Sequence, residues 1–158
     1  MSSGFRSLML TSLFVAPLFA GSIDEARSAF NGAITDAYKQ TVSLLEKDNT
    51  QDGKQAAYKL KEMLNSLNEI FHNSESALEG IDPKLKSQWA DLYRLLKDVL
   101  VMAGVVHSEV GTTNYKSDLS ELKSRWEKLA NEFPKVYATL VEYGKTTMKF
   151  QSLCGSCR

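Results

Sequence analysis

The sequence has only two cysteines, three prolines and nine glycines among its 158 residues. The glycines and prolines fall mostly at the boundaries of apolar segments, and the chain has neither a low-complexity tail nor an internal repeat. β-branched residues nowhere alternate with polar ones, which leaves little support for β-strands. These absences predict an all-α protein with few interruptions of its helices.

Charge of one sign is not in excess, because 19 lysines and arginines balance 19 aspartates and glutamates. Neither a basic footprint for nucleic acid nor a basic amphipathic segment for an anionic membrane surface is present. The sequence also lacks a nucleophile–base pair, a phosphate-binding loop and a zinc-protease motif. We therefore expect no catalysis and no nucleic-acid partner.

The first residues have the pattern of an export signal. One arginine precedes an apolar run of about a dozen residues, which is too short to span a bilayer comfortably. Ala20 and Ser22 then form a small-x-small cleavage site. Residues 1–22 are predicted to be a signal peptide cleaved after Ser22 or Ala20, with an uncleaved interfacial anchor as the alternative. Residues 23–158 would form a single periplasmic or secreted domain with no transmembrane segment.

Four later segments place apolar residues at alternating steps of three and four, which puts them on one face of a helix. The expected stripes are Phe30, Ile34, Ala37, Thr41 and Leu44; Ala56, Leu60, Met63, Leu67, Ile70, Ser74 and Ala77; Leu85, Trp89, Leu92, Leu96, Val99, Ala103 and Val106; and Leu119, Leu122, Trp126, Leu129, Phe133, Val136, Leu140 and Tyr143. Short connections between such segments predict an up-down-up-down four-helix bundle. A three-helix arrangement with one pair merged is the alternative.

Turn and cap residues predict where these helices begin and end. Residues 49–54 are typical of a turn, and Gly80 suits the left-handed conformation just past a helix end. Asp82-Pro83 predicts an N-cap followed by proline in the first helical position. Asp118 begins a sequence similar to a capping box, and Pro134 is expected to kink the last helix.

The sharpest chemical motif is Cys154-Gly155-Ser156-Cys157. As a disulfide in an oxidising compartment, the pair would close a small loop and remove little chain entropy from the unfolded state. As thiolates, Cys154 and Cys157 could bind a soft metal such as copper or zinc, with Met148 as a thioether ligand. Haem attachment is disfavoured, because Arg158 stands where that motif requires histidine.

Residues 99–106 are apolar on every side for two helical turns, unlike the rest of their segment. We expect this stretch either to be fully buried or to meet another surface. Gly104 within it would allow close approach of a neighbouring helix or ligand.

Spacings in three places resemble the periplasmic helical domain of unknown function that accompanies copper and silver efflux adaptors. They are Ile34 to Tyr38 before an acidic turn, Lys123 to Phe133 in the last helix, and Phe150 four positions before Cys154. The resemblance implies metal ligation by Cys154. The family's histidine and methionine correspond here to Leu153 and Ser156, so Cys157 could serve as the substitute soft donor.

The outline of a signal peptide, four helices and a late C-x-x-C is also similar to class II cytochromes of the c-prime type. Taken together, the sequence predicts a small exported metal-handling protein that binds copper or zinc through Cys154, Cys157 and Met148. An envelope protein such as an efflux component would be its partner. Two alternatives remain: a c-prime-like haem or dithiol redox protein, and a periplasmic interaction module with a structural disulfide.

Overall fold

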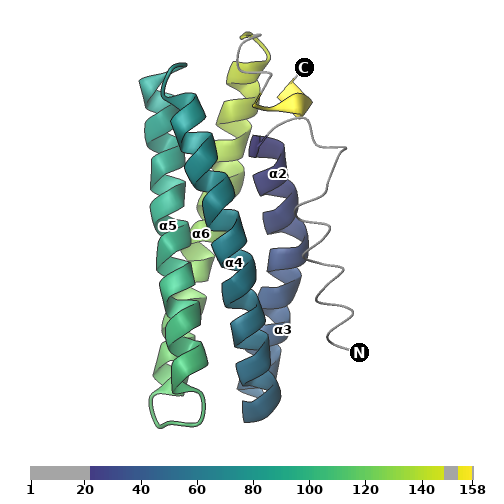
Figure 1. The fold of residues 1–158 in the computed structure, drawn as a ribbon, viewed down its shortest axis with the longest axis vertical. Coiled ribbons are helices and arrows are strands. Elements are labelled where there is room, and N and C mark those ends of the chain that lie inside the picture. The colour runs from purple at the N-terminus through teal and green to yellow at the C-terminus, as the bar shows by residue number, and fades with distance from the viewer. Residues whose placement is uncertain (1–21, 148–152, 158) are drawn as a thin grey trace.

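The computed structural model describes residues 22–147 and 153–157, which form an all-α bundle of four helical rods. The first rod consists of α2 (Ser22–Ala29), a π-helical turn η1 (Phe30–Ile34) and α3 (Thr35–Glu46); the others are α4 (Thr50–Leu78), α5 (Pro83–Glu109) and α6 (Tyr115–Gly144). A short 3-10 turn, η3 (Gly155–Cys157), follows. The described residues contain no strand, and the predicted all-α four-helix bundle is confirmed. Figure 1 shows consecutive rods joined at alternating ends.

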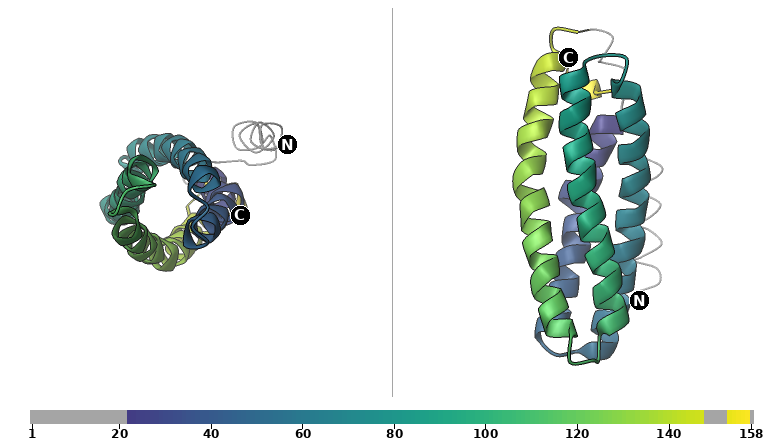
Figure 2. Two further views of the ribbon diagram at one scale, coloured as in Figure 1. Left: turned by 90° about the horizontal axis from the view of Figure 1, so that it is seen from below. Right: turned by 90° about the vertical axis from the view of Figure 1, so that its left-hand side faces the viewer.

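The rods surround one common axis (Figure 2), and their buried apolar side chains form a single core. In α5 every predicted stripe position, from Leu85 to Val106, is buried. Elsewhere the stripes depart from the prediction. Leu45 rather than Leu44 is buried in α3, Leu78 is buried in α4 whereas Ala77 is exposed, and Val136 and Tyr143 of α6 are only partly buried. A helix has 3.6 residues per turn, so a stripe counted in whole steps drifts by a residue along a long helix. No helix in the described part combines the length and hydrophobicity of a membrane span.

Aromatic rings fill the contact between the first rod and α6. The Phe30 ring stacks on Trp126 and Phe133, with ring centroids 5.1 and 4.8 Å apart. Tyr38 stacks on the same indole at 4.0 Å with an interplanar angle of 3°. Such pairs add stability beyond the area that they bury. They join helices that are neighbours in space but lie at opposite ends of the sequence.

The connection between α3 and α4 is shorter than the predicted turn at residues 49–54. Asp48 adopts a left-handed conformation with φ 59°, and the helix resumes at Thr50. The Asn49 side chain caps the new helix by accepting the Asp52 N–H at 3.2 Å. The polar residues that suggested a long turn are therefore the N-cap and first turn of α4, where such residues are also favoured.

The predicted start of α5 is confirmed. The Asp82 side chain accepts the Lys84 N–H at 2.8 Å, and Pro83 occupies the first turn. Gly80, however, does not adopt the left-handed conformation expected of it, and the positive-φ glycine of the described chain is Gly111. The chain after α4 instead turns by hydrogen bonds back to the Leu78 carbonyl.

The capping box predicted at Asp118 is wrong, because α6 begins three residues earlier, at Tyr115. The Tyr115 ring is buried and its hydroxyl donates to the Asp48 carboxylate, which fixes this earlier start against the end of α3. From there α6 continues through Pro134 to Gly144. The kink at Pro134 stays a prediction.

The apolar stretch at residues 99–106 is only partly buried. Val99, Met102, Ala103 and Val106 face the core, whereas Val101 is 59% exposed. A Cβ added to Gly104 would have its nearest neighbour at 3.9 Å, an ordinary contact. No neighbouring helix therefore approaches Gly104 closely.

Close approach occurs instead at Gly53, where an added Cβ would lie 2.5 Å from Leu45 Cδ2. We expect Gly53→Ala to lower the free energy of unfolding by about 1–3 kcal/mol, since a packed core resists added volume. Gly104→Ala is the matched control, because alanine is favoured in a helix by about 1 kcal/mol where space allows. Urea denaturation of both variants measures the difference, and stabilisation by Gly53→Ala would contradict the packing.

Burial, followed by the nearby carboxylates of Glu46 and Glu127, raises the pKa of Tyr38 to about 12. In the unfolded chain a tyrosine titrates near pH 10. The folded state therefore binds the proton more tightly, and this contribution to stability is complete below pH 10 and is lost as the pH rises toward 12. We expect the wild type to lose more unfolding free energy than Tyr38→Phe between pH 10 and 12 in urea titrations. Parallel losses in the two proteins would refute this.

Candidate functional site

The end of the chain folds back onto the beginning of α2. The Ile23 N–H donates to the Leu153 carbonyl at 3.1 Å, and the Ile23 side chain is fully buried. η3 also contacts α6, so this segment lies where the start of the first rod meets the end of the last (Figure 1). The motif that carries the sharpest chemistry is thus packed into one end of the bundle.

Cys154 and Cys157 form a disulfide with their Cα atoms 5.4 Å apart, and both residues are fully buried. A bond between residues only three positions apart restricts the unfolded chain little. Its contribution in the folded state is therefore packing between α2 and α6. The third predicted ligand, Met148, lies outside the described residues, as does Arg158, which argued against haem attachment.

Asp24 of α2 lies beside the disulfide and is hydrogen-bonded to Tyr137 of α6. Asp24 Oδ1 lies 3.7 Å from Cys154 Sγ, and the Tyr137 hydroxyl donates to the same oxygen at 3.0 Å. The Arg27 guanidinium lies over the Tyr137 ring, 5.1 Å from its centroid. A disulfide sulfur has no hydrogen to donate, so the contact between Asp24 and Cys154 is not a hydrogen bond.

Sequence reasoning missed both Asp24 and Tyr137. Asp24 is 130 positions from Cys154 and 113 from Tyr137, and no motif in either segment refers to the other. An acidic residue in the first turn of a helix is common, because it interacts favourably with the helix dipole. The one available signal was the expected bundle itself, which makes the first and last helices neighbours.

Metal binding by the two cysteines requires reduction of the disulfide. In this oxidised form, the described residues contain no group of three or more histidine, cysteine, aspartate or glutamate side chains that could hold a metal ion. Both sulfurs are bonded to each other, and thiolates are the form that binds metals. A thioether-linked haem would need the same two sulfur atoms.

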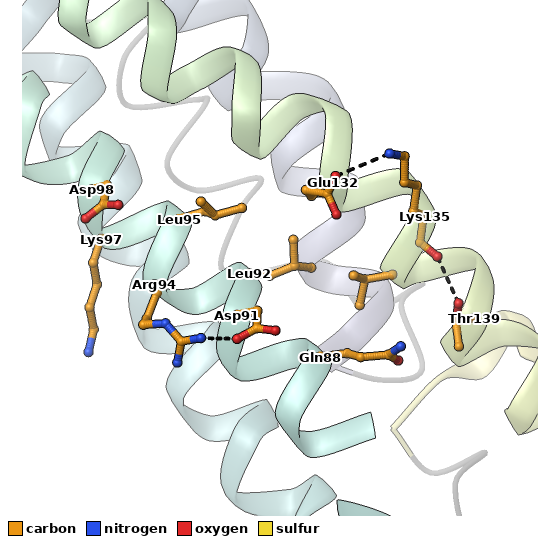
Figure 3. A pocket seen from close by; sticks show the side chains of 11 residues that line it. Gln88, Asp91, Leu92, Arg94, Leu95, Lys97, Asp98, Glu132, Lys135 and Thr139 are labelled. Carbon is orange, nitrogen blue, oxygen red and sulfur yellow. Dashed lines mark hydrogen bonds and ion pairs between the residues drawn. The ribbon is translucent and has the colours of Figure 1, made fainter. Parts of the chain in front are cut away.

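A surface groove of about 630 Å³ between α5 and α6 is a second candidate (Figure 3). Leu92 lies in it, and charged side chains line it on both sides. Arg94 pairs with Asp91, and Lys135 pairs with Glu132 at 3.3 Å. These partners lie on the same helix, and lysines and arginines equal aspartates and glutamates in the lining. The groove therefore offers no preference for a cationic or an anionic ligand.

The Tyr137–Asp24 hydrogen bond holds α6 and α2 together beside the disulfide. Losing it should make it easier for the terminal segment, residues 153–157, to separate from α2. We expect Tyr137→Phe to be reduced by dithiothreitol about tenfold faster than wild type. That ratio corresponds to about 1.4 kcal/mol, the low end for a hydrogen bond to a charged group. Timed alkylation of the released thiols measures the rate, and Tyr93→Phe on α5 is the control. Equal rates in all three proteins would show that the hydrogen bond does not hold the segment.

Comparison with known proteins gives no match to any family model, curated protein or solved structure. The resemblances to the efflux-associated helical domain and to c-prime cytochromes therefore stay predictions from the sequence. What points to function is the chemistry of the terminal disulfide and its neighbours.

Proposed function

We propose that this protein is exported and handles a soft metal ion through Cys154 and Cys157 in their reduced form. The observation that carries the proposal is a partly buried carboxylate oxygen of Asp24 that lies 3.7 Å from one sulfur of the buried cysteine pair. Thiolates held close together are favoured ligands of Cu(I) and zinc. The bundle supplies a rigid frame that fixes these groups, and no catalytic step is assigned to them.

The proposed chemistry has two steps. A thiol reductant converts the disulfide to two thiols and is itself oxidised to a disulfide. The metal ion then displaces one proton from each of Cys154 and Cys157. Because protons and metal compete for the same sulfurs, the affinity falls as the pH is lowered.

Export and partnership complete the proposal. Residues 1–22 direct the chain across a membrane, and Met148 supplies a thioether to a soft ion such as copper. An envelope protein such as an efflux component would deliver or receive the ion. Since the buried sulfurs must be reached from outside, the terminal segment opens locally during exchange.

An interaction module is the second candidate, and two exposed apolar side chains, one on α4 and one on α5, favour it. Tyr58 and Val101 are 44% and 59% exposed, and they are the large apolar side chains most open to solvent in the described chain. Tyr58 also lies beside His107, with ring centroids 5.4 Å apart. In this alternative a partner protein covers these exposed side chains, and the disulfide is structural.

Titration of the reduced, oxygen-free protein with zinc or Cu(I) tests the metal proposal. We expect one ion per chain, and a Cys154→Ser, Cys157→Ser double variant that binds none at the same concentrations. Circular dichroism confirms that the double variant keeps its helices. Unchanged stoichiometry in the double variant, or no binding by the reduced wild type, would rule out metal handling at this site.

A further inference from the structure

We infer that Asp24 is a third ligand of Zn²⁺ at the reduced site, and that this carboxylate strengthens the binding of Zn²⁺ but not that of Cu(I). The inference rests on the proposed metal-handling function and adds a residue and a preference that the C-x-x-C motif does not contain. It starts from the position of Asp24 beside Cys154, at a separation of 3.7 Å between Oδ1 and Sγ.

That separation suits two ligands of one zinc ion. Zinc lies about 2.3 Å from a thiolate and about 2.1 Å from a carboxylate oxygen, so tetrahedral geometry places the two ligand atoms about 3.6 Å apart. The observed distance between Asp24 Oδ1 and Cys154 Sγ is 3.7 Å. After reduction, the two sulfurs have to separate to about 3.8 Å, as on one zinc tetrahedron. Asp24 therefore needs little displacement to become a ligand.

The backbone fixes this register. Ile23, the residue before Asp24, is hydrogen-bonded to Leu153, the residue before Cys154. The two candidate ligands are thus adjacent to a pair of residues that are joined at 3.1 Å. Because these two ligands are already held near each other, metal binding loses less conformational entropy in ordering them.

Tyr137 has the role of a positioning residue. Its hydroxyl donates to Asp24 Oδ1 at 3.0 Å, and metal-binding carboxylates are commonly oriented by such hydrogen bonds. In the reduced, metal-bound form the carboxylate would face a cation.

The chemical type of each ligand determines which metal gains affinity from Asp24. Thiolates suit both Cu(I) and zinc, but a carboxylate oxygen is a hard donor that zinc accepts and Cu(I) does not favour. Two sulfurs and one oxygen occupy three positions of a zinc tetrahedron and leave the fourth to an exchangeable ligand. Cu(I) would be bound by the sulfurs and would gain little from Asp24.

The test compares Zn²⁺ and Cu(I) affinities of reduced wild type, Asp24→Asn and Asp36→Asn, each by competition with a chromophoric chelator. Asp36 is an exposed acid on α3 and serves as the matched control. We expect Asp24→Asn to weaken zinc binding at least about tenfold, in the range for loss of metal-site interactions. Its Cu(I) affinity and both affinities of Asp36→Asn should stay within about twofold of wild type. Asp24→Glu, which keeps the carboxylate, should recover part of the zinc affinity.

Equal losses for both metals, or an unchanged zinc affinity in Asp24→Asn, would overturn the assignment of Asp24. Metal binding that survives in the double cysteine variant would instead overturn the proposed function, so the two failures are distinguishable. If Asp24→Asn does not fold, Tyr137→Phe carries the same comparison. A weaker zinc site with unchanged Cu(I) affinity supports the inference, and equal retention of both metals refutes it.

Discussion

The bundle depends on closure between its first and last helices, which are neighbours in space and lie at opposite ends of the described sequence. Stacked rings of Phe30, Tyr38 and Trp126 form the middle of this contact, and the backbone bond between Ile23 and Leu153 forms its end. Without it, the apolar side chains that these two rods turn toward each other would be exposed to water, which costs free energy. Closure is also what brings a carboxylate to the cysteine pair.

The same contact gives the terminal segment two chemical states with different requirements. As a disulfide, the two cysteines are buried between α2 and α6, and their sulfurs need no polar partner. As a dithiol, it would bring two acidic groups close to Asp24, where Tyr137 already donates a hydrogen bond. A buried thiolate pair beside a carboxylate is unfavourable unless a cation joins it, because like charges repel in a poorly hydrated site. Reduction and metal binding are therefore coupled in the proposed cycle.

The sequence predicted features that depend on local periodicity and missed features that depend on distant contacts. The α5 stripe and its start at Asp82 were correct, because burial and capping there follow from neighbouring residues. The start of α6 was misplaced, since it is fixed by Tyr115 reaching Asp48 across 67 positions. The cysteines were identified by their motif, but their partner Asp24 was not. A single sequence has no period or spacing that links residues 130 positions apart.

The position of residues 153–157 has a consequence for the order of events during folding. Helix pairs joined by short connections can associate early, since their contacts are close in sequence. Residues 153–157 come last in the described chain, although the surface of α2 that they contact is among the first. Ile23 and Asp24 stay exposed until this long-range contact forms. We therefore expect the end of the bundle that holds the cysteines to be completed after the helix pairs with short connections.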